Sequence, residues 1–186
     1  MDRRAVQEEE ETMKKVNLYI AIGAHGPRRQ HSIYGWILEQ VLSNGESGGT
    51  LNKFGDCEDT TDREACLIAL NEALARFIEP CEIDIYISPE YEAEEFPTPW
   101  KQGWVDKWEA AGWKNSNGKE IVKAEAWQNA KNALQKHSYT FRGPKEKNSY
   151  KQWLTDEINK RQTEKIRAFE EKQKAEAAEK GKPAKA

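Results

Sequence analysis

The stretch WKQGWVDKWEAAGWKNSNGKEIVKAEAW, residues 100–127, decides how the rest of the chain is interpreted. Trp100, Trp104 and Trp108 are spaced by four, so a single helix would carry these indoles on one face. Gly112 follows them, and a glycine can end a helix in the left-handed conformation. Indoles at helical spacing bury a large apolar area far more often than they bind ligands. The pattern therefore predicts packed indoles, followed by a polar turn and a second helix.

The sequence on either side of this stretch alternates between strand and helix patterns. Three β-rich segments at the start predict antiparallel strands joined by turns. A helix and then a short apolar strand follow, and this order favours a strand that runs parallel to the first. The expected elements are strands over 16–22, 33–42 and 51–54, a helix over 63–78, a strand over 83–87, a helix that Gly112 ends, a helix over 122–134 and a strand over 139–141.

The two ends of the chain differ in composition from its middle. Residues 1–15 include four consecutive glutamates and few apolar residues, which predicts a disordered acidic leader. Residues 16–160 carry the periodic pattern of one folded domain. Residues 161–186 are rich in Lys, Glu, Ala and Gln, which predicts a charged tail that is helical or disordered.

Composition and cysteine spacing favour a cytoplasmic protein. No apolar run approaches the roughly 18 residues needed to cross a membrane, and the start of the chain lacks the apolar core of a signal peptide. Cys57, Cys66 and Cys81 are odd in number and have no CxxC spacing, so neither disulfides nor a structural zinc site is expected. Cys66 and Cys81 are predicted to be buried thiols that pack as small hydrophobic groups.

The order of these elements and the pattern WVDKWEAAGWK, residues 104–114, resemble type 1 ribonucleases H. In that family a Trp-rich helix and a basic loop, together called the handle, bind an RNA/DNA hybrid. The resemblance covers about residues 16–160. It implies an α/β fold with a mixed five-stranded sheet, in which three antiparallel strands are followed by parallel additions, with helices on both faces. The segments that carry it are residues 16–19, 32–38, 66–74, 83–91 and 139–141, besides the handle, residues 100–127.

The resemblance also implies where catalytic carboxylates should lie. Family members cleave the RNA strand with two Mg²⁺ ions, and such hard cations need several carboxylate oxygens at one point. The four family positions fall here on Ala21 or Ile22 in the first strand, Cys66 in the first helix, Ser88 at the end of the central strand and Gln152 in the last helix. Because no carboxylate stands at any of them, neither a metal site nor a cofactor is expected.

Three nearby carboxylates leave an alternative open. Glu64 lies on a different face of the first helix, Glu90 follows the central strand, and Asp156 lies one helical turn after Gln152. The family's histidine loop is replaced by GPKEK, residues 143–147. An active Mg²⁺-dependent ribonuclease with these rearranged ligands is therefore an alternative, and the sequence leaves open whether the protein is an enzyme.

Basic residues gather in the segments that the resemblance places against a hybrid. Residues 44–95 hold 14 acidic and 3 basic residues, whereas residues 137–153 carry a net charge of +3. Lysine and arginine attract phosphate, but the total charge of −3 predicts weak and salt-sensitive binding. The candidate nucleic-acid-binding residues are Arg28, Arg29, Trp104, Lys107, Lys114, Lys119, Lys123, Arg142, Lys145 and Lys147.

Together these features favour one function over two others. The favoured function is a catalytically degenerate ribonuclease H-like protein that binds RNA/DNA hybrid or other nucleic acid through its Trp/Lys handle. Trp104 and Trp108 are expected to anchor the handle to the body, while the handle lysines point to solvent. The alternatives are the active ribonuclease and a scaffold that binds a protein partner through its acidic face or its tails; a membrane partner is not expected.

Overall fold

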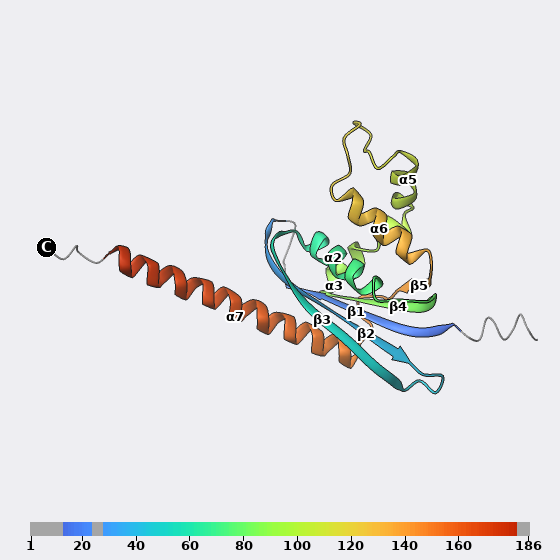
Figure 1. Ribbon diagram of the computed structural model, residues 1–186, viewed down its shortest axis with the longest axis horizontal. Helices are drawn as coiled ribbons and strands as arrows, with labels where there is room; N and C mark the ends of the chain where they lie inside the picture. Colours follow the sequence, from blue (N-terminus) through green and yellow to red (C-terminus); the bar gives the residue numbers. More distant parts are fainter. Residues whose placement is uncertain (1–12, 24–27, 182–186) are drawn as a thin grey trace, which may run out of the picture.

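The structure is a computed structural model that describes residues 13–23 and 28–181. Its centre is one five-stranded sheet with the strand order β3-β2-β1-β4-β5 (Figure 1). β1 pairs with β2, and β2 with β3, in antiparallel register, whereas β4 is parallel to both β1 and β5. This arrangement confirms the predicted mixed α/β sheet. The strands are β1 (Lys14–Ile22), β2 (Gln30–Val41), β3 (Ser47–Thr60), β4 (Cys81–Ser88) and β5 (Ser138–Phe141).

Helices cover both faces of this sheet, as predicted (Figure 1). α2 (Asp62–Leu74) and α6 (Ala124–Leu134) pack on one face, which we call the α2 face. The first part of α7 (Ser149–Lys180) packs on the other, the α7 face. Three short helices, α3 (Glu90–Glu95), α4 (Thr98–Lys101) and α5 (Trp104–Ala110), lead from β4 to α6.

Side chains alternate between the two faces along the central strands, because successive residues of a strand point in opposite directions. In β1, Leu18, Ile20 and Ile22 are buried on the α2 face. Tyr19 and Ala21 are buried on the α7 face, against α7. The carboxyl end of β1 therefore presents an alanine, not a larger side chain, to α7.

The first helix begins where its sequence predicts and ends earlier. Thr61 and Glu64 form a capping box, in which each side chain bonds to the other residue's backbone N–H. The helix ends at Leu74 and not at the expected residue 78. Ile78 is 98% exposed, so it has no apolar surface against which a further turn could pack.

The handle departs from its prediction at Gly103. This glycine has a positive φ of 71°, a left-handed conformation that side chains disfavour, and it separates α4 from α5. The single helix expected over the tryptophans is therefore wrong, and Trp100 does not share a helix with Trp104 and Trp108. Gly112 does follow the end of α5, with a φ of 66°, as predicted.

Trp104 was expected to anchor the handle, but its side chain is 38% exposed, so this expectation is wrong. The anchor is Trp127 on α6, which is 5% exposed. Its ring lies 5.5 Å from those of Trp100 and Trp108 and 5.9 Å from that of Phe96. Once Gly103 turns the chain, Trp104 lies at the edge of this cluster, where it contacts the ring of Trp108 at 6.3 Å.

α7 crosses the sheet and then leaves it (Figure 1). Leu154 and Ile158 are its buried residues, and beyond them Gln162 bonds to β2. Its amide accepts from the Ile33 N–H at 2.8 Å and donates to the His31 carbonyl at 3.2 Å. These bonds satisfy backbone groups at the start of β2. The tail predicted as helical or disordered is thus helical as far as Lys180.

The domain boundaries expected from composition are less distinct in the structure. Most of the leader, residues 1–15, lies outside the described residues, but Lys14 and Lys15 already pair with β4. α7 runs without interruption through the boundary expected at 160. Cys66 and Cys81 are buried thiols, as predicted. Within the described residues, no helix combines the length and apolar content needed to cross a bilayer.

Candidate functional site

Two of the four family positions, Ala21 and Ser88, come together where β1 and β4 end, and a third, Gln152, lies at the edge of the adjacent cleft. Ala21 and Ser88 are direct register partners in the parallel β1–β4 pair, and both side chains are buried on the α7 face. The Thr155 hydroxyl of α7 lies 2.8 Å from the Ser88 hydroxyl and 2.8 Å from the Lys151 carbonyl oxygen. Gln152, one turn before Thr155, lines the cleft that Ser88 also lines.

Cys66 does not join them. Its side chain is fully buried in the core of the α2 face, and burial raises the pKa of its thiol well above the ordinary value. Ile22, the alternative first-strand position, is also buried on the α2 face. The expectation that Cys66 marks the site is therefore corrected: position 66 belongs to the core-facing side of α2.

Thr155 is not among the site residues predicted from the sequence, although one sequence signal points to it. It follows Gln152 by three residues, a spacing that places both on neighbouring positions of one helix face. Thr155, and not Gln152, contacts Ser88. Gln152 instead donates to Asp156 Oδ1 at 2.9 Å on the exposed side of the helix.

The residues at this meeting point do not fit a two-magnesium site. A methyl group and two neutral hydroxyls supply no anionic oxygen, which Mg²⁺ and Ca²⁺ sites require. Asp156 is exposed and bonded to Gln152, and Glu90 is exposed at the cleft. Across residues 13–23 and 28–181, no three His, Cys, Asp or Glu side chains gather closely enough to hold a metal ion.

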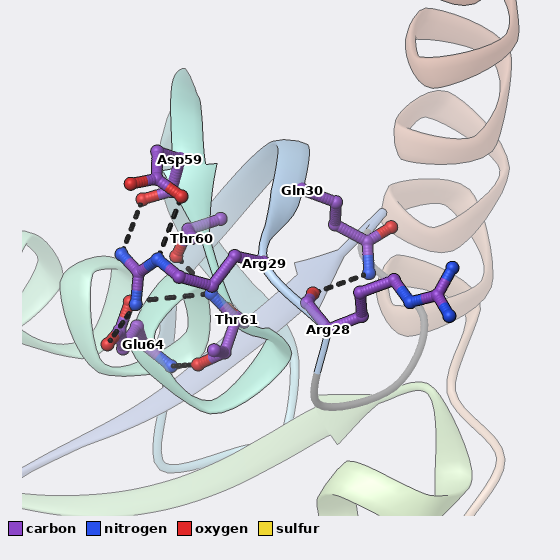
Figure 2. A network of polar contacts seen from close by, with 7 residues as sticks. All are labelled: Arg28, Arg29, Gln30, Asp59, Thr60, Thr61 and Glu64. Carbon is purple, nitrogen blue, oxygen red and sulfur yellow. Dashed lines mark hydrogen bonds and ion pairs between the residues drawn. The ribbon is translucent and has the colours of Figure 1, made fainter.

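Glu64, the third stand-in, is occupied by contacts within the chain. Figure 2 shows the Arg29 guanidinium turned toward Asp59 and Glu64, while the Arg28 side chain extends away from them. Arg29 donates to Asp59 Oδ1 at 2.8 Å and to Glu64 Oε1 at 3.1 Å. Glu64 also completes the capping box of α2 with Thr61. Arg28, whose side chain is turned away from these acids, is thus the better candidate for a nucleic-acid contact on this segment.

The cleft beside Ser88 has a volume of about 920 Å³ and a mixed charge. Lys151 lies in its wall and donates to the carbonyl oxygens of Pro144 at 3.0 Å and Glu146 at 3.4 Å. Partial burial lowers the pKa of the Lys151 amine, and the negative charges of Glu90 and Glu146 oppose that shift. The cleft is lined by Ser88, Pro89, Glu90, Pro144, Lys145, Glu146, Lys147, Asn148, Ser149, Lys151, Gln152 and Thr155.

Arg142, a candidate nucleic-acid contact, forms ion pairs within the chain. Its guanidinium lies 3.0 Å from Asp84 Oδ2, and Asp84 is 5% exposed on β4. A second contact, at 3.8 Å, joins it to Glu146. These pairs hold the loop between β5 and α7 against the sheet. Because Arg142 neutralises a buried carboxylate, fewer of its donors are left for a ligand.

The lysines of the handle point to solvent, as predicted. Lys107, Lys114, Lys119 and Lys123 are all exposed. The turn between them is ordered by Asn115, whose side-chain oxygen accepts from the backbone N–H groups of residues 117 and 119 at 2.9 and 3.0 Å. The exposed Trp104 lies on α5, three residues before Lys107. The handle therefore presents exposed lysines and one exposed indole to solvent.

A pair of carboxyl groups that the sequence analysis missed is buried on the α2 face. Glu92 of α3 is 1% exposed, and Asp62 at the start of α2 is 8% exposed. Burial and the hydrogen bond and charge of Asp62 raise the pKa of Glu92 to about 8. One sequence signal points to the burial of Glu92. It precedes the buried Phe96 by four residues, so both side chains lie on the same, inward-facing side of their helix.

Comparison with known proteins adds the family evidence. No family model matches the chain. The chain is 34% identical over 116 residues to the ribonuclease H of Acetivibrio thermocellus, covering 62% of this chain and 71% of that protein. It is 30% identical over 129 residues to the ribonuclease H of Clostridium botulinum, covering 69% of this chain and 81% of that protein.

Solved structures are similar to this fold at lower identity. A type 1 RNase H with the type 2 active-site motif superposes with a TM-score of 0.56 at 18% identity, covering 76% of this chain and 69% of that one. The foamy viral protease-reverse transcriptase in complex with RNA/DNA hybrid superposes with a TM-score of 0.52 at 16% identity, covering 78% of this chain and 19% of that one. These likenesses confirm the fold class.

Proposed function

The chain belongs to the ribonuclease H family, and from that premise we propose that it is a catalytically degenerate member that binds nucleic acid without cleaving it. The observation that carries the proposal is the meeting of Ala21, Ser88 and Thr155 where β1 and β4 end. In a two-metal mechanism the protein must supply anionic oxygens to neutralise the ions. A methyl group and two hydroxyls supply none. Hydrolysis through this point would have no ions to activate water or to stabilise the leaving group.

The proposed ligand is an RNA/DNA hybrid or a related duplex. A foamy viral protein of this fold was solved with such a hybrid, and the handle of this chain presents exposed lysines and the exposed Trp104. Lysine contacts to phosphate release counterions, so affinity should fall steeply with salt. The net charge of the whole chain, −3, should make binding weak at physiological salt.

The decisive experiment measures cleavage and binding in the same tubes. A labelled hybrid is incubated with the protein and Mg²⁺ or Mn²⁺, and binding is followed by anisotropy at low and high salt. We expect salt-sensitive binding without metal-dependent cleavage. Binding to single-stranded RNA, duplex RNA and duplex DNA of the same length is measured as well, to establish which nucleic acid the protein prefers.

Two results would replace this proposal. Cleavage that disappears in a Glu90→Gln, Asp156→Asn variant would establish the active alternative with rearranged ligands. The absence of binding to every nucleic acid at every salt concentration would leave the protein-scaffold alternative.

A further inference from the structure

The cleft beside Ser88 contains positive charge where a metal-dependent site would contain negative charge. Lys145, Lys147 and Lys151 line it, against two acids, Glu90 and Glu146. One of these acids, Glu146, also lies 3.8 Å from the Arg142 guanidinium, which offsets its charge. The cleft is therefore net cationic, in a domain whose total charge is negative.

The position of Lys151 is defined by contacts of its backbone carbonyl and of its ammonium group. Its carbonyl oxygen lies 2.8 Å from the Thr155 hydroxyl, which in turn lies 2.8 Å from Ser88. Its ammonium group donates to the carbonyls of Pro144 and Glu146. Lys151 is thus fixed one helical turn from the point where β4 meets α7. An ammonium group held this way loses less side-chain entropy on binding a ligand than a free surface lysine.

The start of α7 adds to the positive electrostatic potential of the cleft. α7 begins at Ser149, after the cap residue Asn148, and both residues line the cleft. The N-terminus of a long helix carries a partial positive charge and unpaired N–H groups, which favour phosphate. Partial burial lowers the pKa of Lys151, which means that its ammonium has lost hydration. A bound anion would accept from the third N–H of this ammonium group, which the carbonyls of Pro144 and Glu146 leave available.

We propose that this cleft binds a phosphate group without a metal ion, with Lys151, Lys145 and Lys147 supplying the positive charge. In effect, ammonium groups covalently attached to the chain take the charge-neutralising role of divalent cations, but they do not activate water. This inference rests on the proposed function when the phosphate belongs to a nucleic-acid backbone. The same chemistry would also accept free phosphate, and the experiment separates the two sources.

The test compares the parent with Lys151→Met, with Lys151→Arg and with a control, Lys136→Met. Lys136 is exposed and lies outside the cleft lining. Binding of a fluorescent hybrid is measured in EDTA from 25 to about 200 mM salt, and inorganic phosphate is titrated while backbone amide NMR signals are followed. Circular dichroism establishes that each variant is folded.

We expect hybrid binding in EDTA that Lys151→Met weakens about tenfold, because it removes one charge-assisted contact. The slope of log affinity against log salt should also fall by about 0.9. Lys151→Arg should retain most of the affinity, and Lys136→Met should match the parent. In the parent, phosphate should shift the amide signals of residues 149–155.

The outcomes separate the inference from the proposed function. Hybrid binding that is equal in the parent and in folded Lys151→Met would overturn the inference and leave the proposed function intact. A parent that binds no hybrid, yet shows phosphate shifts in residues 149–155 that Lys151→Met abolishes, would support the site for free phosphate and reject the proposed function. Binding that requires Mg²⁺ would overturn the inference.

Discussion

The two faces of the sheet differ in chemistry near the end of β4. On the α7 face, the hydroxyls of Ser88 and Thr155 meet beside a lysine-lined cleft. On the α2 face, the carboxyl groups of Asp62 and Glu92 are buried, and Glu92 follows Ser88 by only four residues. Carboxyl groups are thus present at this end of the domain, but they are buried on the face away from the cleft. The face on which a carboxylate is buried therefore decides whether it can reach the cleft beside Ser88.

The faces also differ in how much apolar packing they contain. Among residues 13–23 and 28–181, the α2-face core contains 25 buried residues and extends into the handle, whereas the α7-face core contains five. Burial of apolar surface contributes about 25 cal/mol per Å². Most of the stability of the domain should therefore come from the α2 face. The α7 face can hold polar residues at the candidate site at a smaller cost to the fold.

The largest expected effect is on the α2-face core. Trp127→Ala should lower the free energy of unfolding by about 3–5 kcal/mol, because it removes the ring that contacts Trp100, Trp108 and Phe96. Trp104→Ala is the matched control, and its exposed ring should cost less than about 1 kcal/mol. Urea denaturation of both variants measures the difference. Equal losses would contradict the assignment of Trp127 as the anchor.

The second effect is the pH dependence of the free energy of unfolding, which tests the buried carboxyl pair. The pKa of Glu92 is raised to about 8 in the folded protein, above its ordinary value of 4.5. Between these values the folded state holds a proton that the unfolded state has released, so the free energy of unfolding falls as pH rises. The stability that the Glu92 proton contributes is fully present below about pH 4.5 and is lost as pH rises through about 8.

Glu92→Gln should remove this dependence. Near pH 8 the variant should be about 4 kcal/mol more stable than the parent, and near pH 4.5 the two should be similar. Denaturant midpoints at the two pH values measure the change. Glu90→Gln is the control, because Glu90 is exposed on the same short helix. A parent whose stability is flat over this range would show that Glu92 is not buried as described.

A smaller effect tests the hydroxyl contact on the α7 face. Ser88→Ala and Thr155→Val should each lower the free energy of unfolding by about 1 kcal/mol. The double variant should lose less than the sum of the two, because both substitutions remove the same contact. Thr163→Val is the control, since Thr163 is exposed on the same helix and bonds only locally, to the Asn159 carbonyl. Strict additivity in the double-mutant cycle would argue that the hydroxyls do not interact.

The smallest effect on stability concerns the handle lysines. Replacing Lys107, Lys114, Lys119 and Lys123 one at a time by Met should change the free energy of unfolding by less than about 0.5 kcal/mol, because all four are exposed. Hybrid affinity should nevertheless fall, and each lost phosphate contact should reduce the salt slope by about one. Variants that bind as tightly as the parent at every salt concentration would remove the handle from the proposed interface.

Local sequence patterns, together with the resemblance to type 1 ribonucleases H, were enough to predict the fold class, most of the element order and the solvent-facing lysines of the handle. Strand composition and helical spacing act over a few neighbours, so the strand over residues 16–22 and the start of the helix near residue 63 could be assigned without knowing their partners. Strand ends were predicted less well. β3 extends over Ser47–Thr60, far beyond the expected 51–54, because its hydrogen bonds come from β2 and not from its own propensity.

Only the tertiary structure decided which residues meet at the site. Ser88 and Thr155 are 67 positions apart, and they meet because β1 and β4 are parallel and Leu154 and Ile158 seat α7 on the sheet. The burial of Glu92 likewise depends on the fold, which brings α3 after β4 to a position where Glu92 bonds to Asp62 at the start of α2. Spacing along the chain describes which face of one element a residue occupies. Which faces come into contact is determined by the packing of distant elements, and that packing placed a methyl group and two hydroxyls, not carboxylates, where β1 and β4 end.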